Sequence, residues 1–170
     1  MTRLLPVLLA AVLVAGCGSD KEKPASAKSD ATAAPAAAFS PGGISTDLKQ
    51  EPKIPKPAGD PPTKLVIKDI VKGKGKKAKA GDLLSMQYTG VSFSTGEKFD
   101  ASWDRGAEPF QFPVGGGQVI PGWDQGIPGM RVGGRRELVI PPDLAYGPAG
   151  QGTIGPNETL IFVIDMEAIA

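Results

Sequence analysis

The chain has 170 residues, with 19 basic and 18 acidic side chains, one cysteine and no histidine. The absence of histidine excludes histidine-dependent catalytic triads and histidine-ligated metal sites. The charges are balanced both before and after residue 62, so the basic excess typical of nucleic-acid-binding proteins is missing. We therefore expect no metal, no other cofactor and no nucleic-acid partner.

Residues 1–16 have the pattern of a targeting signal. Arg3 supplies a positive flank, and residues 4–14 form an apolar run of 11 residues, whereas a membrane span needs about 20. Ala15 and Gly16 before Cys17 resemble the lipobox of bacterial lipoproteins, where the signal is cut before the cysteine and its sulfur carries a diacylglycerol. This pattern predicts lipidation at Cys17 and an extracytoplasmic, membrane-anchored domain. The alternative is an ordinary secretory signal with a chance cysteine.

Residues 17–62 are predicted to form a tether. From residue 18 they contain eight prolines and few large apolar side chains, and such a stretch cannot offset its ordering entropy by burial. As a flexible coil it would reach on the order of 35 to 40 Å. The proline-dense part, residues 51–62, favours a stiff polyproline II arm, which could either stand free or lie against the domain that follows.

Residues 63–170 contain short apolar runs separated by glycine and proline. These runs predict five strands, within residues 64–73, 83–93, 110–115, 135–140 and 159–169. One short helix is expected around residues 122–127, because glycine and Pro128 limit its length. The pattern predicts a small antiparallel α+β domain whose sheet faces the helix on one side and water on the other. The lysine-rich stretch 73–81 is interpreted as a solvated hairpin loop.

Rotation about an X-Pro amide bond is one reaction that this composition could support. The rotation breaks no bond, and its barrier of roughly 18 to 20 kcal/mol comes from amide resonance. An apolar, water-poor pocket favours the twisted amide, and fixed donors can hold the flanking carbonyls. Such an enzyme needs aromatic walls and few polar groups.

Several aromatic residues of the chain stand beside polar or turn residues in short motifs. In chain order the motifs are Tyr88-Thr-Gly, Lys98-Phe-Asp-Ala-Ser, Pro109-Phe, Val119-Ile-Pro-Gly-Trp, Pro142-Asp-Leu-Ala-Tyr-Gly and Thr159-Leu-Ile-Phe. Together, at this spacing, they closely resemble the FKBP family of peptidyl-prolyl isomerases over roughly residues 64–169. The resemblance implies a twisted antiparallel sheet wrapped around one short α-helix, isomerase activity on proline-containing polypeptides, and affinity for tacrolimus and rapamycin.

The resemblance also implies roles for individual residues. Trp123 would be the floor under the prolyl ring rather than only a core residue. The Tyr146 hydroxyl and the Ile120 backbone N–H would each donate to a carbonyl of the bound ligand. Asp100 would be the one carboxylate of the pocket, held by Tyr88 and Arg105. The walls would be Tyr88, Phe99, Phe110, Val119, Ile120 and Phe162, and the residues expected to act in catalysis are Tyr88, Phe99, Asp100, Tyr146 and Phe162.

The loop at residues 147–157 departs from the family pattern. It looks about one residue shorter, and it has Gln151 and Thr153 where well-known members carry histidine and a branched aliphatic residue. Ile154 is retained and is expected to bind substrate. Because this loop overhangs the pocket, the departures bear on substrate preference and macrolide affinity. Trp103 matches no pocket position of the family and is expected on the surface or in a loop.

The leading hypothesis is a lipid-anchored, extracytoplasmic prolyl isomerase that assists the folding of exported proteins. One alternative is a binding module that grips proline-containing segments with negligible turnover. A second alternative is a lipoprotein that captures a solute for a transporter, for which about 108 residues without a second lobe are poorly suited.

Overall fold

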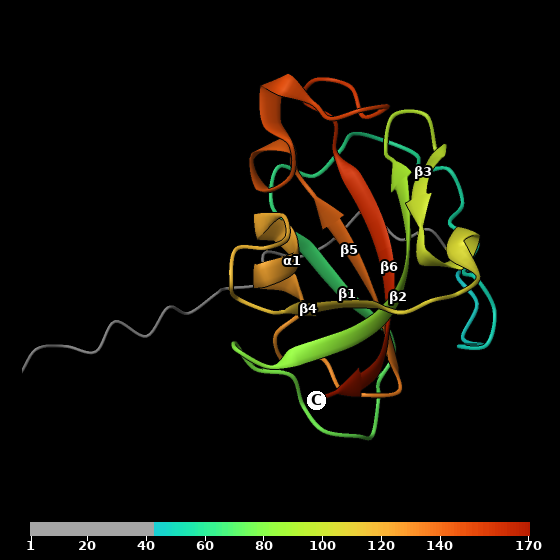
Figure 1. Cartoon of the computed structure of the whole chain (residues 1–170). Coiled ribbons are helices and arrows are strands. Elements are labelled where there is room, and N and C mark those ends of the chain that lie inside the picture. The colour runs from blue at the N-terminus through green and yellow to red at the C-terminus, as the bar shows by residue number, and fades with distance from the viewer. Residues whose placement is uncertain (1–42) are drawn as a thin grey trace, which may run out of the picture. The chain divides into compact units, whose positions relative to one another are not determined.

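The computed structural model describes residues 43–170; residues 1–42, which include the predicted signal peptide, Cys17 and much of the predicted tether, lie outside the described residues. The described chain forms one antiparallel sheet in the order β1-β5-β6-β2-β3, and β4 also pairs with β2 (Figure 1). The strands are β1 (Val66–Val71), β2 (Leu83–Ser92), β3 (Lys98–Ala101), β4 (Phe110–Pro113), β5 (Gly134–Ile140) and β6 (Leu160–Ile169). The helices are α1 (Pro121–Gly126) and the short 3₁₀ helices η1 (Ser102–Arg105), η2 (Pro142–Leu144) and η3 (Gly147–Ala149). The predicted α+β class is confirmed.

No helix within residues 43–170 has the length and apolar character needed to cross a membrane.

Strand β6 lies in the middle of the sheet, between β5 and β2. As the period of two predicts, Leu160, Phe162, Ile164 and Met166 all belong to the core on the helix side, the inner face. Ile161 points the other way and packs in a second cluster on the outer face. Every residue of β5 is buried, so the expectation that the other face meets water is wrong in the middle of the sheet.

Two further expectations need correction. The sheet has six strands instead of five, because β3 is a separate strand that pairs with β2. It is only four residues long and has no run of alternating apolar residues, so periodicity does not reveal it. The lysine-rich stretch 73–81 is not a hairpin loop, because the strands that it joins pair elsewhere: β1 with β5, and β2 with β3, β4 and β6.

Helix α1 begins at Pro121, one residue before the predicted start, and packs directly on β5. Proline is favoured in the first turn because its missing N–H has no partner there in any case. A Cβ on Gly126 would lie 2.7 Å from the Leu138 side chain, so glycine allows the close approach. The Arg136 guanidinium donates to the Gly126 carbonyl at 2.8 Å and to Asp69 at 2.7 Å, which joins the end of α1 to β5 and β1.

The outer face of the sheet is covered by residues 43–62, the N-terminal segment. Ile54 packs against the outer cluster, which consists of Val91, Phe93, Val139 and Ile161. Ile44 and Pro52 are also buried. The part of the predicted tether that the structure describes therefore lies along the domain, including the proline-dense arm, and the folded unit extends before residue 63.

Candidate active site

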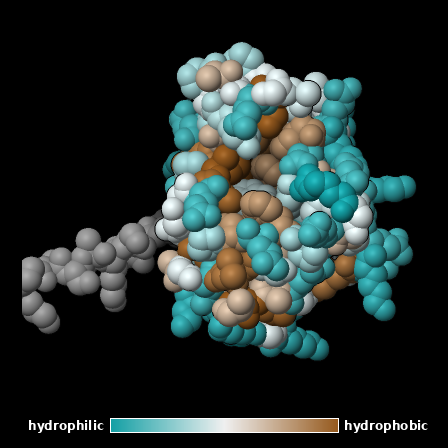
Figure 2. Space-filling model, in the orientation of Figure 1, coloured by the Kyte–Doolittle hydropathy of each residue, from teal (hydrophilic) through white to brown (hydrophobic). Residues whose placement is uncertain are grey.

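The inner face carries a cavity of about 480 Å³. A hollow rimmed by apolar side chains is visible on this side of the molecule (Figure 2). The cavity is lined by Tyr88, Phe99, Asp100, Phe110, Gln118, Val119, Ile120, Trp123, Tyr146, Gln151 and Phe162. These residues come from β2, β3, β4, α1 and β6 and from the segments that precede α1 and β6.

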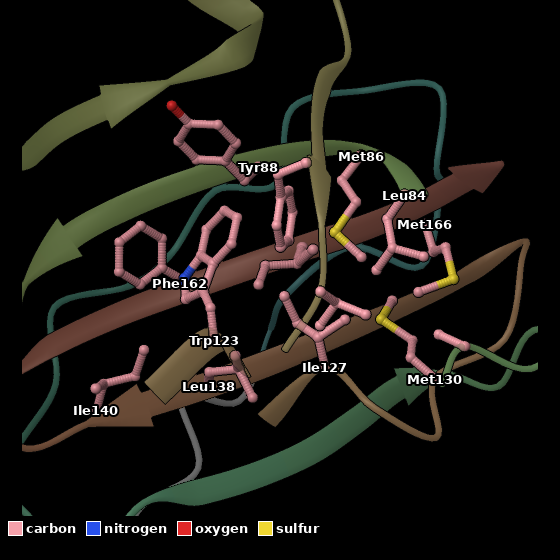
Figure 3. Packing of buried hydrophobic residues seen from close by; sticks show 14 of the residues in the cluster. Leu84, Met86, Tyr88, Trp123, Ile127, Met130, Leu138, Ile140, Phe162 and Met166 are labelled. Atoms are coloured by element: carbon pink, nitrogen blue, oxygen red, sulfur yellow. The ribbon is translucent and has the colours of Figure 1, made fainter. Parts of the chain in front are cut away.

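Aromatic rings form the base of the cavity around Trp123, which α1 holds 4% exposed. The indole meets the ring of Phe162 at 5.1 Å and 86°, and the ring of Tyr88 at 5.3 Å and 79°. These are edge-to-face contacts, which favour a fixed ring orientation. Figure 3 shows the three side chains gathered at one end of the core, with Met86, Leu84, Met166 and Met130 filling the other end. The base of the cavity is thus apolar and rigidly packed.

Gly90 makes room for the wall beside this base. It pairs with Asp100 on β3 and with Phe162 on β6. A Cβ at Gly90 would lie 2.7 Å from the Phe99 ring and 2.8 Å from the Phe162 ring. Because glycine has no side chain, the two rings meet edge to face at 5.5 Å. Gly90 belongs to the Tyr88-Thr-Gly motif, but its spatial role becomes visible only in the sheet.

The one carboxylate of the cavity, Asp100, is held by two donors. The Tyr88 hydroxyl donates to Oδ2, and Arg105 Nη1 donates to Oδ1 at 2.7 Å. Arg105 Nη2 also donates to the Tyr88 hydroxyl at 2.7 Å. Burial opposes ionisation of Asp100, but these hydrogen bonds outweigh it and place its pKa below the ordinary value. Burial and the hydrogen bond to Asp100 raise the pKa of Tyr88 to about 12. Asp100 is therefore a fixed negative charge at neutral pH.

Tyr146 is a further polar residue that lines the cavity. It follows η2 and is partly buried. Burial, and then the charge of Asp100, raise its pKa, so its hydroxyl keeps its proton at neutral pH. Nothing within residues 43–170 accepts a hydrogen bond from this hydroxyl. It is available to donate to a ligand.

Asp124 holds the segment between β4 and α1. Its carboxylate accepts from the Gly115 N–H at 2.7 Å and from the Gly117 N–H at 2.9 Å. The same segment supplies Gln118, Val119 and Ile120 to the cavity. Sequence reasoning missed this role of Asp124, although a carboxylate in the first turn of a helix, just after a glycine-rich stretch, is the signal that could have indicated it.

The structure brings nearly all of the predicted site residues together. Arg105 stands behind Asp100 and Tyr88 instead of lining the cavity. Ile154 does not reach the cavity: its side chain is buried in the inner core, and its backbone pairs with Gln151, which lines the cavity in its place. Trp103 lies outside the cavity, as expected, but is partly buried on η1 rather than fully at the surface.

Within residues 43–170, no group of three or more histidine, cysteine, aspartate or glutamate residues is arranged to hold a metal ion.

Known proteins resemble this chain in sequence and in fold. The profile of the FKBP-type peptidyl-prolyl cis-trans isomerase family matches residues 74–167. The FK506-binding protein of Streptomyces anulatus is 59% identical over 122 residues, which are 71% of this chain and 98% of that protein. A probable FK506-binding protein of Corynebacterium glutamicum is 51% identical over 117 residues, or 69% of this chain and 97% of that protein.

Solved structures agree with these sequence matches. The crystal structure of AtFKBP13 matches with a TM-score of 0.59 at 41% identity, covering 65% of this chain and 96% of that one. The crystal structure of FkpA from Escherichia coli matches with a TM-score of 0.57 at 41% identity, covering 63% of this chain and 48% of that one. The family match over more than half of the chain, together with this fold, shows that the chain belongs to the FKBP-type peptidyl-prolyl cis-trans isomerases and is an enzyme of that class.

Proposed function

We propose that this enzyme accelerates X-Pro bond rotation in exported polypeptides by placing the prolyl ring on the indole of Trp123. The observation that supports this best is a cavity with an aromatic base, a carboxylate already satisfied by Tyr88 and Arg105, and a hydroxyl, on Tyr146, that has no acceptor in the described part of the chain. The site has apolar surface for a ring and a donor for a carbonyl.

Desolvation of the amide is the main catalytic effect in this proposal. Water stabilises the charge-separated resonance form that makes the X-Pro bond stiff, so an apolar cavity raises the energy of the planar amide more than that of the twisted one. Water is excluded from the base by the rings that contact Trp123, which are Tyr88, Phe110 and Phe162, and by Phe99, which contacts Phe162.

Fixed donors complete the proposed mechanism. The Tyr146 hydroxyl and the Ile120 backbone N–H donate to the carbonyls that flank the rotating bond and keep the peptide in place while its amide turns. Asp100 supplies a constant negative charge beside the rotating carbonyl and moves no proton, because its two oxygens already accept from Tyr88 and Arg105.

A protease-coupled isomerisation assay on a Pro-containing peptide tests the proposal. We expect catalysis that a macrolide inhibits, and loss of catalysis in Asp100→Leu. A chain that binds the peptide but does not accelerate rotation would support the binding module instead. If the chain neither binds nor isomerises proline-containing peptides, the result would favour the alternative of a lipoprotein that captures a solute for a transporter.

The cavity should also bind macrolides of the tacrolimus and rapamycin type, since the related proteins named above are called FK506-binding proteins. A ligand on the floor of the cavity changes the surroundings of the Trp123 indole. Rapamycin titration should therefore change tryptophan emission, and the change should persist in Trp103→Phe. Tight binding without a change in Trp123 emission would contradict the floor assignment, whereas failure to bind would implicate the loop at residues 147–157.

For location, we propose export and lipidation at Cys17, with the residues that follow Cys17 linking the lipid to the folded unit. The support is the sequence around Cys17, the only cysteine of the chain. In a bacterial host, Cys17→Ser should leave an uncleaved precursor or a protein without diacylglycerol. Normal cleavage and normal lipid labelling of this variant would contradict the proposal without affecting the isomerase assignment.

A further inference from the structure

Six exposed cations gather at the end of the domain away from the loop at residues 147–157. They are Lys72, Lys74, Lys76, Lys77, Lys79 and Arg131, which we call the basic end. The strands show its position: β1 ends at Val71 beside Arg135, and Gly133 N–H donates to the carbonyl of Met166, near the end of β6. The loop at residues 147–157 instead leads into Leu160, where β6 begins. Figure 1 shows the two segments at opposite ends of the molecule.

The charges of the basic end are hardly neutralised by the described part of the chain. Among residues 43–170, the one ion pair that these cations make joins Lys76 Nζ to Asp82 Oδ1, at 4.0 Å. The chain as a whole has nearly equal numbers of basic and acidic residues. The basic end is therefore a local concentration of positive charge on a protein with little net charge.

The backbone that carries these lysines is held in place. Gly75 N–H donates to the Val132 carbonyl at 3.0 Å, and Val132 N–H donates to the Lys76 carbonyl at 3.1 Å. Ala78 N–H donates to the Met130 carbonyl at 2.8 Å, and the Ala78 side chain is buried in the core. Arg131 Nη1 donates to the Gly75 carbonyl at 3.0 Å. Because the backbone is already ordered, an ionic contact here costs less entropy than in a free lysine-rich tail.

Apolar surface lies beside the charge. Leu83, the first residue of β2, is 43% exposed, and its carbonyl accepts from the N–H of Ala170 at 2.9 Å. An exposed apolar side chain close in sequence to Lys76, Lys77 and Lys79 suits the interface of an anionic bilayer, where ammonium groups meet phosphates and an apolar group enters the headgroup layer. The stretch 72–82 has no aromatic side chain on which a nucleic-acid base could stack.

We propose that the basic end docks on anionic phospholipid surfaces and holds the enzyme with its substrate cavity turned toward the surrounding water. This proposal does not depend on the isomerase chemistry. It relies on the proposed function only in that the anchor at Cys17 would hold the protein near a membrane. An anchor would keep the basic end at high effective concentration near the membrane, so that weak ionic contacts suffice.

Vesicle flotation tests the proposal with residues 17–170 carrying Cys17→Ser, which lack both the apolar run of residues 4–14 and a thiol to carry lipid. We expect the protein to float with vesicles containing phosphatidylglycerol and not with vesicles of phosphatidylcholine alone. Flotation should disappear at about 1 M salt, where the Debye length falls to about 3 Å. The triple variant Lys74→Gln, Lys76→Gln, Lys77→Gln should lower the partition coefficient at least tenfold.

The matched control is Lys49→Gln, Lys53→Gln, Lys64→Gln, which removes the same charge from exposed lysines elsewhere. It should keep most of the vesicle binding, and both triple variants should keep the kcat/KM of the parent chain. Equal loss of binding in the two triple variants would overturn the proposal, because net charge alone would then explain it. Absence of binding at low salt, or tighter binding to duplex DNA than to the vesicles at the same salt, would also overturn it.

Discussion

The two faces of the sheet are built from the same strands and hold different kinds of side chain. On the inner face, Phe162 and Leu138 belong to the core that surrounds Trp123. On the outer face, Ile161 and Val139 lie one residue away in the chain and pack under the N-terminal segment. The inner face leaves a cavity with a donor, the Tyr146 hydroxyl, that lacks an acceptor among residues 43–170, whereas the outer face is covered by the N-terminal segment.

Charged groups make the contrast sharper. Asp100 on the inner side is partly exposed, and its partners leave it beside an open cavity. On the outer side, Arg135 is fully buried and donates to both oxygens of Asp165 at 2.6 Å. The same guanidinium donates to the carbonyls of Ser45 and Gln50 at 2.6 and 3.0 Å. The Arg135–Asp165 pair is therefore closed off within the fold, whereas the Asp100–Arg105 pair stands beside the cavity.

The largest expected effect is a loss of stability in Arg135→Ala. The change leaves Asp165 buried without its partner and releases the carbonyls of Ser45 and Gln50, so the free energy of unfolding should fall by about 3 to 5 kcal/mol. Denaturant unfolding measures this loss. At a temperature where the variant stays folded, kcat/KM should remain within about twofold of the parent value.

The matched control for this prediction is the double variant Arg135→Met, Asp165→Leu. It removes both charges together, so it should cost less than Arg135→Ala alone. If Arg135→Ala instead lowers kcat/KM and leaves stability unchanged, the two faces are not separate in function.

The next largest effect is a pH dependence of stability that comes from Glu137. This residue is buried on the outer side, and its Oε1 has no hydrogen-bond partner within the described chain. Burial raises its pKa to about 7, against 4.5 ordinarily, although Lys68 opposes the shift. Between these values the folded protein binds the proton more tightly than the unfolded chain, so the contribution of Glu137 to stability falls as pH rises and levels off above pH 7. The total change is on the order of 3 kcal/mol.

Glu137→Gln should therefore raise the free energy of unfolding at pH 8 and change it little at pH 4.5. Denaturant unfolding of the parent and the variant from pH 4.5 to 8 measures how much of the pH dependence of the unfolding free energy comes from Glu137. Parallel curves for the parent and the variant would show that this carboxylate does not titrate in the folded protein near pH 7.

On the inner face, Asp100→Leu and Phe99→Ala should each lower kcat/KM on a Pro-containing peptide at least tenfold, about 1.4 kcal/mol. Each removes a group that faces the cavity, and both should leave the protein folded. Phe110→Ala should act similarly. Trp103→Phe is the control and should do little; a silent Asp100→Leu together with a damaging Trp103→Phe would place the site elsewhere.

The smallest expected effect is that of pH on the rate. The chain has no histidine, Tyr88 has a pKa of about 12, and the pKa of Asp100 lies below its ordinary value. On a non-titrating peptide, kcat/KM should stay within about twofold from pH 6 to 8.5 and fall only on the acid side, as Asp100 protonates. A bell-shaped profile centred near pH 7 would require acid–base chemistry, or would mean that Glu137 on the outer face influences the cavity.

Local patterns in the sequence indicated much of the inner face. The period of two in β6 placed Phe162 and its neighbours correctly on one side, because alternate residues of a strand point the same way. The motifs around Tyr88, Phe99 and Trp123 named residues that do line the cavity, through their resemblance to a family whose fold keeps them together. Helix α1 was expected within one residue because proline and glycine limit it locally.

Tertiary structure alone decided the rest, because the deciding contacts join residues far apart in the chain. Arg135 donates hydrogen bonds to the carbonyls of Ser45 and Gln50. These bonds help to hold a proline-rich stretch, which the sequence predicts to be a tether, against the outer face. Strand β3 exists through its pairing with β2, and the backbone pairing between Gln151 and Ile154 puts Gln151 at the cavity and Ile154 in the core. The sequence by itself determined which residues are apolar and at what spacing. Which residue of the loop at 147–157 meets the cavity depends on backbone hydrogen bonds that no local pattern records.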